Sequence, residues 1–357
     1  MRVGIACGGT GGHIFPGLAT AEALMERGHE VTLWLVGKAI ESSRIAGWDG
    51  PVQLVQAEGL SASGLKRLGA VFEMGRAVWQ CRRIMSRNRP DIMLGMGSYA
   101  SVAPILAARS FGVPSVLHEA NAVPGRAVSF LSGSAKAVAV SFESAKNYIK
   151  HRDVVVTGFP IRREVLNRSA ERLLPSDVFT ILVTGGSQGA HFLNELVSTA
   201  VCRLQEAGLE LQVVHLAGRQ DEDMVRRRYD KQGITSVVYG FCSEMARAYV
   251  SADFVIARAG ASTCAEISAF AVPALLIPLP TAIRNHQVAN ANEMVAKGGV
   301  DMMEQDDLSV NKLVEYLHCR MHDSKLLADM KNAFAHVGQS RDAANELVSL
   351  LERVCDQ

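Results

Sequence analysis

The chain has 357 residues, too many for one ordinary core and suited to two domains of roughly 100–200 residues each. It is 48% hydrophobic and 20% charged, which excludes a disordered, collagen-like or coiled-coil protein. The formal net charge of +1 excludes an overall basic field for nucleic acid.

Seven scattered cysteines without a CxxC pair argue against a zinc cage and a disulfide framework, and predict free thiols in a reducing cytoplasm. No secretory signal is visible at the first residues. Two apolar charge-free runs, 92–108 and 267–283, hold 17 residues each and contain Gly or Pro. A spanning helix needs about 20 mostly apolar residues, so we expect none.

The first half of the chain alternates short apolar runs, typical of buried parallel strands, with Gly-rich loops and helices. A strand at 3–7 precedes a Gly-rich loop at 8–12. The next helix should open near Pro16 and close at Gly28, because Pro favours the first turn and Gly follows the last. Further strands are predicted at 31–36, 52–55, 92–95, 115–118, 137–140 and 154–157.

The same pattern restarts in the second half. A strand at 179–184, a Gly-rich loop at 185–189 and a helix at 191–206 are followed by strands at 211–216, 237–239, 254–257 and 274–277. Repeated βα units imply parallel sheets covered by helices on both faces, so we expect two Rossmann-like domains. The polar stretch 162–177 should be the linker, and an apolar helix at 343–354 could pack on either domain.

Charge is divided unevenly along the chain. Residues 1–160 carry 17 Lys and Arg against 11 Asp and Glu, and the remainder carries 20 against 25. Much of the positive excess lies in 65–90, where seven basic residues face Glu73 alone. These alternate with Leu65, Leu68, Phe72 and Trp79, a pattern that suits a membrane surface. An ordinary surface helix with solvated arginines explains the segment equally well.

Residues 8–13 read Gly-Gly-Thr-Gly-Gly-His directly after the first strand. Glycines there let the backbone approach a ligand, and a helix N-terminus favours an anion. A dinucleotide site would need Gly at position 14, which is Ile14, and an acidic residue where the second strand ends, but residues 35–38 read Leu-Val-Gly-Lys. An NAD site is therefore disfavoured. His13 could act as a general base or be a loop histidine bonded to the backbone.

Two loops of the second half also suit an anion. Residues 185–190 can offer backbone N–H groups before a helix. Residues 258–266 run from Arg258 through a turn at Gly260 into a helix near Ser262, with Glu266 placed to bind ribose hydroxyls. The alternative is that Thr263 and Glu266 form a capping box.

Two further groups of polar residues can each be interpreted in two ways. One group could bind sugar hydroxyls through its amides and imidazole or simply form a polar helix start, and it comprises His286, Gln287 and Asn290. Asp221 and Asp223 match the DxD pattern of metal-using transferases, but a charged run surrounds them and we read a solvated helix face. A Walker-type Gly-Lys-Ser is missing, which argues against an ATPase.

Seven motifs occur in chain order between Arg2 and about Gly298: GGTGGH at 8–13, GMGSYAS at 95–101, HEANAVPG at 118–125, TGFPIR at 157–162, GGSQGA at 185–190, RAGASTCAE at 258–266 and HQVANA at 286–291. Together they resemble the MurG family of peptidoglycan glucosaminyltransferases. The resemblance implies a GT-B glycosyltransferase fold of the α/β class, with two Rossmann-like parallel-sheet domains facing a cleft. It implies an acceptor and membrane-side domain at 1–160 with the C-terminal helix at about 341–357, and a UDP-sugar domain at 161–340.

The resemblance also assigns residues of this chain to the two substrates. The implied donor contacts are Phe241, Cys242 and Met245 around the uracil, Glu266 on the ribose, Ser187, Gln188, Ala261, Ser262 and Thr263 around the diphosphate, and Asn121, His286 and Gln287 at the sugar. The implied acceptor-side residues are Thr10, Gly11, Gly12, His13, Tyr99 and Glu119, with Arg162 near the hinge.

The activity implied is an inverting transfer of N-acetylglucosamine from UDP-N-acetylglucosamine to the C4 hydroxyl of the muramoyl sugar of lipid I, giving lipid II. We expect His13 as the base with Glu119 as competitor, no bound metal or other cofactor, and no nucleic acid partner. The expected location is the cytoplasmic face of the cell membrane, on anionic lipid and beside cell-wall or division proteins. A sugar-nucleotide epimerase and a non-catalytic membrane scaffold remain as alternatives.

Overall fold

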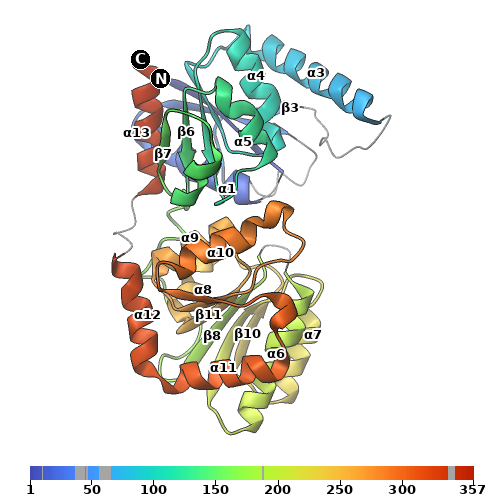
Figure 1. Ribbon diagram of the computed structural model, residues 1–357, viewed down its shortest axis with the longest axis vertical. Coiled ribbons are helices and arrows are strands. Elements are labelled where there is room, and N and C mark those ends of the chain that lie inside the picture. Colours follow the sequence, from blue (N-terminus) through green and yellow to red (C-terminus); the bar gives the residue numbers. More distant parts are fainter. Residues whose placement is uncertain (10, 37–44, 46, 56–65, 187–188, 337–341) are drawn as a thin grey trace. The chain divides into compact units, whose positions relative to one another are not determined.

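The computed structural model describes residues 1–9, 11–36, 45, 47–55, 66–186, 189–336 and 342–357. The chain divides into two compact units, each a parallel sheet flanked by helices (Figure 1). Unit 1 comprises Met1–Arg162 and Arg341–Gln357, and unit 2 comprises Arg163–Ser340.

Unit 1 is built on a seven-stranded sheet in the order β3-β2-β1-β4-β5-β6-β7, with every neighbouring pair parallel. Its strands are β1 (Arg2–Gly8), β2 (Glu30–Val36), β3 (Val52–Val55), β4 (Ile92–Gly95), β5 (Ser115–Glu119), β6 (Ala137–Val140) and β7 (Val154–Val156). All residues of β4, β5 and β6 are buried, because helices cover both faces. The order runs outward from β1 in both directions, which is the doubly wound arrangement.

The helices of unit 1 are α1 (Gly11–Glu26), α3 (Lys66–Met85), α4 (Val102–Ser110), α5 (Arg126–Leu131) and α13 (Ala343–Cys355). The predicted start of the first helix near Pro16 is wrong, because α1 begins at Gly11. Glycine disfavours helix and proline usually occupies the first turn, so the sequence pattern placed the start of the helix too late. Burial of Gly11 and Ile14 accompanies the additional first turn, in which His13 lies.

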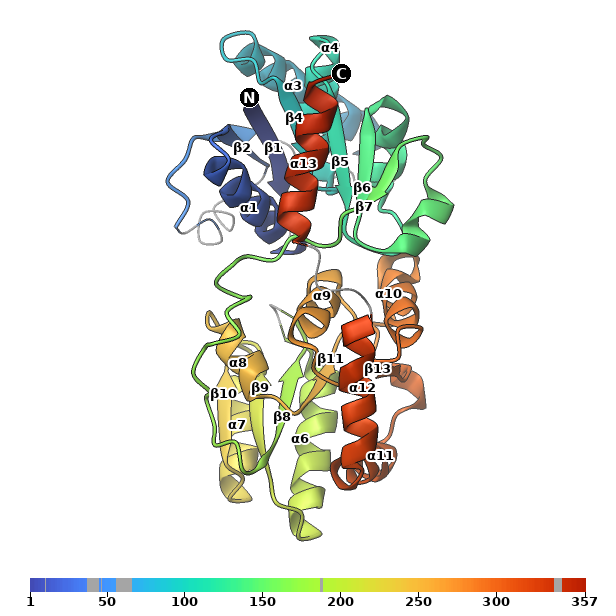
Figure 2. The ribbon, with the colours of Figure 1, turned by 90° about the vertical axis from the view of Figure 1, so that its left-hand side faces the viewer.

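The C-terminal helix α13 lies beside α1 in unit 1 (Figure 2). Leu347 and Leu351 are fully buried in the same core as residues of β1 and α1. At the rim of this contact Arg27 and His29 each lie 2.8 Å from a carboxylate oxygen of Glu352. An apolar seam with a charged edge therefore joins the two ends of the sequence.

Unit 2 has a six-stranded parallel sheet in the order β10-β9-β8-β11-β12-β13. Its strands are β8 (Phe179–Thr184), β9 (Leu211–Leu216), β10 (Ser236–Tyr239), β11 (Phe254–Ala257), β12 (Ala274–Leu276) and β13 (Val300–Met302). Its helices are α6 (His191–Glu206), α7 (Glu222–Lys231), α8 (Met245–Ser251), α9 (Ala261–Phe270), α10 (His286–Val295), α11 (Val310–His322) and α12 (Ser324–His336). Sequence missed β13, since three residues with one aspartate give no apolar run.

The segment expected as a linker packs on unit 2. The guanidinium of Arg172 donates to the carbonyls of Val250 at 2.9 Å and Ser251 at 2.7 Å, and the Leu173 N–H donates to Ser251 Oγ at 2.7 Å. The polar residues of this segment that suggested a linker therefore include ones that hydrogen-bond within unit 2. Over the residues described, no helix combines the length and apolar character that crossing a bilayer requires.

Candidate functional site

In unit 1 the candidate residues gather where β1, β4 and β5 end, three strands that are neighbours in the sheet. After β1 the backbone turns at Gly9, whose φ of +88° favours glycine, and a Cβ atom there would lie in ordinary contact with the Tyr99 ring, at 3.8 Å. Tyr99 begins a short 3-10 helix after β4. Gly11 and Gly12 form the first turn of α1, and Thr10 lies outside the described residues.

His13 is half-buried in that first turn. Its Nδ1 donates to the Met96 carbonyl at 2.8 Å, at the end of β4. A neutral imidazole that donates from Nδ1 carries its lone pair on Nε2, across the ring. His13 is therefore bonded to the backbone, as the alternative to a catalytic role predicted. The same hydrogen bond holds the imidazole in the tautomer that a general base needs.

Glu119, at the end of β5, is 2% exposed and shapes the loop after it. Its two oxygens accept the backbone N–H groups of Asn121 at 3.0 Å and Gly125 at 2.8 Å, and one also accepts from Asn121 Nδ2 at 3.3 Å. Burial raises the pKa of Glu119, against the effect of these hydrogen bonds. The carboxylate therefore organises the loop that carries Asn121, and both of its oxygens already accept hydrogen bonds.

His118 is a buried neighbour that the sequence did not single out as a separate side chain. Its Nε2 donates to the Gly158 carbonyl at 3.1 Å, and burial lowers its pKa to about 4. Downstream of Gly158, the Arg162 guanidinium lies 4.3 Å from the centre of the Phe15 ring in α1. The 157–162 motif is thereby held against the strand end and the helix that carry Glu119 and His13.

In unit 2 the Gly-rich loop after β8 brings the start of α6 to the sheet edge. Gly189 has φ +77°, and a Cβ atom there would lie 2.1 Å from the Ala217 carbonyl oxygen, so only glycine fits. Ser187 and Gln188 lie outside the described residues. α6 begins two residues after Gly189, at His191.

Helix α9 presents its N-terminus at the end of β11. Its N-cap is Gly260, which has no side chain to cap the helix, and Ala261, Ser262 and Thr263 are the first three helical residues. Helix geometry leaves their N–H groups without carbonyl partners in the helix, and the dipole favours an anion there. The capping-box alternative is wrong, because Thr263 lies inside the helix and not at its N-cap.

Glu266 is half-buried one turn further into α9. It accepts a hydrogen bond from the Tyr249 hydroxyl of α8 at 2.9 Å. Between β10 and α8, Phe241 is 61% exposed, Cys242 is buried and Met245 opens the helix. The aromatic ring of Phe241 and the backbone at Cys242 thus follow β10, and the carboxylate of Glu266 follows β11.

The polar side chains after β12 mainly form hydrogen bonds to the backbone around them. α10 begins at His286, whose Nδ1 donates to the Ile283 carbonyl at 2.8 Å. Gln287 accepts from the Leu279 N–H at 2.9 Å, and buried Asn290 donates to the Ala259 carbonyl at 3.0 Å. The polar helix start is present, and Asn290 ties it to the entry of α9.

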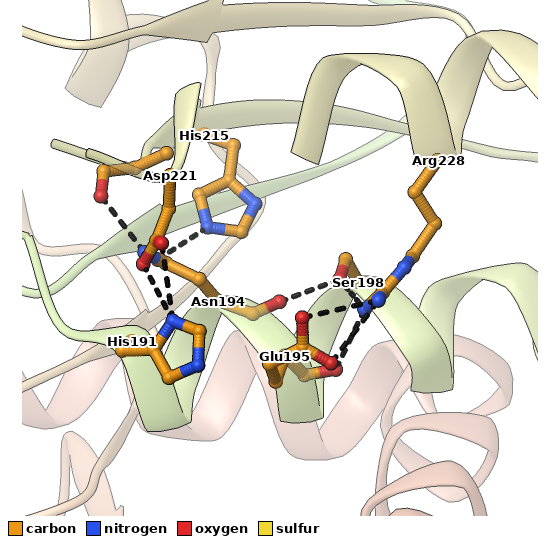
Figure 3. A network of polar contacts seen from close by, with 8 residues as sticks. His191, Asn194, Glu195, Ser198, His215, Asp221 and Arg228 are labelled. Carbon is orange, nitrogen blue, oxygen red and sulfur yellow. Dashed lines mark hydrogen bonds and ion pairs between the residues drawn. The ribbon is translucent and has the colours of Figure 1, made fainter. Parts of the chain in front are cut away.

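The Asp221 carboxylate belongs to a side-chain network and not to a solvated face (Figure 3). Its oxygens accept from His191 Nδ1 at 3.0 Å and Asn194 Nδ2 at 2.7 Å, while Asn194 Oδ1 lies 3.0 Å from His215 Nε2. Burial lowers the pKa of His215 to about 3, so that ring is neutral. Asp223 is exposed as expected. The prediction for Asp221 failed because residues 27 and 30 positions earlier supply its partners.

The described side chains contain no cluster of three or more His, Cys, Asp or Glu that could ligate a metal. The Asp221 oxygens are occupied by the two donors named above.

Comparison with known proteins assigns both units. Residues 3–140 match the glycosyltransferase family 28 N-terminal domain, and residues 180–347 match the glycosyltransferase family 28 C-terminal domain. Curated relatives from Myxococcus xanthus and Citrifermentans bemidjiense are 34% and 36% identical, each over 98% of this chain and over 92% and 99% of those proteins. Both are named UDP-N-acetylglucosamine–N-acetylmuramyl-(pentapeptide) pyrophosphoryl-undecaprenol N-acetylglucosamine transferase.

A crystal structure of Acinetobacter baumannii MurG matches with a TM-score of 0.80 and 31% identity, covering 99% of each chain. The chain belongs to the MurG family. The expected GT-B class, with two parallel-sheet α/β domains, is confirmed, and this MurG-family chain is a glycosyltransferase. A UDP-N-acetylglucosamine 2-epimerase structure from Listeria monocytogenes shares the fold at a TM-score of 0.69, but is only 14% identical. That likeness concerns fold alone.

Proposed function

We propose that this chain transfers N-acetylglucosamine from UDP-N-acetylglucosamine to the C4 hydroxyl of the muramoyl sugar of lipid I, with inversion, to form lipid II. The observation that carries the proposal is the alignment of 98% of the chain with relatives named for transfer to the lipid-linked muramoyl acceptor. Incubation with UDP-N-acetylglucosamine, with and without a lipid I analogue, tests it. Lipid II should appear only with the acceptor, whereas a free epimer formed without acceptor would contradict it.

The donor is proposed to bind unit 2. Exposed Phe241 and the Cys242 backbone suit the uracil, with Met245 beside them, and Glu266 suits both ribose hydroxyls. The uncapped amides of α9 suit the diphosphate and would stabilise charge on departing UDP. His286 and Gln287 are proposed to lie near the transferred sugar.

The acceptor is proposed to bind unit 1 at the ends of β1, β4 and β5. His13 Nε2 takes the proton of the attacking hydroxyl, while its Nδ1–H stays on the Met96 carbonyl. Glu119 is the weaker candidate, because its oxygens accept hydrogen bonds from the loop it organises. Tyr99 and the turn at Gly11 and Gly12 lie at the same strand ends.

Replacing Glu266 with Ala should raise the KM for UDP-N-acetylglucosamine at least about tenfold. A hydrogen bond to a charged group contributes roughly 1.5–3 kcal/mol, and about 1.4 kcal/mol is tenfold in affinity. Tyr249→Phe is the matched control, since it removes the hydroxyl on Glu266 but keeps the carboxylate. Steady-state kinetics with circular dichroism would decide. An unfolded Glu266→Ala protein with normal donor affinity in its folded fraction contradicts the assignment.

His13→Ala should lower kcat by about 10²–10⁴-fold, the usual effect of losing a general base. Donor affinity should change little, because His13 belongs to unit 1. Glu119→Ala, measured in parallel, should lower thermal stability together with activity, since two backbone N–H groups lose their acceptor. Near-normal turnover by His13→Ala with loss in a folded Glu119→Ala protein would move the base to Glu119.

Turnover should continue in EDTA, because we propose that the protein holds no metal. The charge on departing UDP would instead be stabilised by helix amides. Asp221→Asn with Asp223→Asn keeps the side-chain shapes and should leave the response to EDTA unchanged. Activity lost in EDTA and regained with Mn²⁺ would be the opposite result.

Helix α3 is proposed to dock on the anionic cytoplasmic leaflet. Ala77, Cys81 and Met85 bury one face, while Phe72 and Trp79 are 72% and 62% exposed. Exposed Arg82 and Arg83 are close by, and Arg83 lies 5.8 Å from the Trp79 ring. Leu65 and the side chain of Leu68 lie outside the described part of the helix. Apolar insertion together with basic charge gives reversible, salt-sensitive binding.

Phe72→Ser with Trp79→Ser, and separately Arg82→Glu with Arg83→Glu, should each reduce binding to anionic vesicles and turnover of long-chain acceptor. Each basic residue near an anionic surface is worth about 1 kcal/mol. Turnover of a short-chain acceptor should be retained. The charge-matched control is Lys150→Glu with Arg152→Glu, before β7 at the sheet edge opposite β3. Equal losses on both acceptors would mean that α3 is structural.

A further inference from the structure

Arg258, at the end of β11, is a buried cation whose partners are all neutral. Its side chain is 6% exposed. Nη1 donates to the carbonyls of Ile277 and Pro278, both at 3.1 Å, and Nη2 donates to Gln305 Oε1 at 2.7 Å. Nε is buried with no hydrogen-bond partner. Among the residues described, no carboxylate pairs with this guanidinium.

A charge buried in this way is costly unless an opposite charge compensates it. Burial lowers the pKa of Arg258 to about 10, so the group remains protonated at neutral pH. Two less deeply buried arginines of unit 2 do have carboxylate partners: Arg228 lies 3.1 Å from Glu195 and Arg320 lies 2.6 Å from Asp301. Arg258 has no such partner among the residues described, although it is more deeply buried than either of them.

The uncompensated charge lies at the edge where the anion-binding elements begin. The guanidinium carbon is 6.0 Å from the ring of Phe192, the second residue of α6. Along the chain, Arg258 precedes the Gly260 N-cap of α9 by two residues. Both helices direct the positive ends of their dipoles toward this edge of the sheet. The guanidinium of Arg258 adds a full positive charge to the partial positive charges at the N-termini of α6 and α9.

We propose that Arg258 is the buried counter-charge of the donor's diphosphate, held by neutral partners so that its field stays available to the ligand. This rests on the proposed function, which supplies a nucleoside diphosphate as donor. Carbonyl and amide oxygens orient the guanidinium without cancelling its charge, whereas a carboxylate would neutralise it. Arg258 thus favours the diphosphate over the nucleoside without touching the uracil or the ribose.

The decisive variant is Gln305→Glu, which places a carboxylate on Arg258 with almost no change of shape. UDP affinity should fall roughly tenfold, the size expected when one charge is neutralised several ångströms from another. Uridine affinity should stay within about twofold, because uridine carries no phosphate. Thermal stability should be equal or higher, since the buried charge gains a partner. Isothermal titration with UDP and with uridine, and thermal unfolding without ligand, measure all three.

Asn311→Asp is the matched control. Asn311 Oδ1 accepts from Arg203 in the last turn of α6, so the variant adds the same charge beside another arginine of unit 2. Arg203 lies 11 residues along α6 from Phe192, a rise of about 16 Å. UDP affinity should be unchanged. Arg258→Met gives a second route to the UDP-selective loss if Gln305→Glu does not fold.

Equal losses of UDP and uridine affinity, or unchanged UDP affinity in folded Gln305→Glu protein, would overturn this inference and leave the proposed function standing. Failure of the wild-type chain to bind UDP would overturn the proposed function, and the inference with it.

Discussion

Both candidate sites depend on places where two backbone segments pass too closely for a side chain. A Cβ atom on Gly189 would lie 2.1 Å from the Ala217 carbonyl oxygen, and one on Gly97 would lie 2.7 Å from the His118 carbonyl oxygen. Each glycine follows one strand and touches the end of the neighbouring strand. Positive φ at both positions turns the chain back along the sheet edge. Helix starts and polar side chains can then crowd the edge where parallel strands end.

The strands could be predicted because they are buried on both faces and therefore appear as continuous apolar runs. The same reasoning cannot find β13, whose Val-Asp-Met sequence is held by pairing with β12. It also misplaces the start of α1, where burial of Gly11 and Ile14 outweighs weak glycine propensity. Local rules fail where contacts distant in sequence decide the conformation.

Site residues show the same division between local pattern and packing. The motif order indicated His13 and Glu119 together, but only the structure separates their surroundings. Nδ1 of His13 donates a hydrogen bond to a carbonyl 83 residues away in the sequence. Both oxygens of Glu119 instead accept hydrogen bonds from the loop that follows it. Arg258 is similar: sequence marks it as part of a loop motif, while the neutrality of its partners appears only when β12 and the segment after β13 are in place.

The packing of α13 in unit 1 sets an order for folding during synthesis. The buried side of α13, which includes Leu347, Leu350 and Leu351, completes a core whose other buried residues all precede residue 140, and partly buried Val155 packs against it. The face of α1 that they cover stays open until α13 has left the ribosome. Unit 2 is continuous in sequence and can close its core earlier, although its residues are made second. Unit 1 is therefore begun before unit 2 and completed after it, and removal of α13 would damage a core built from the N-terminal half of the chain.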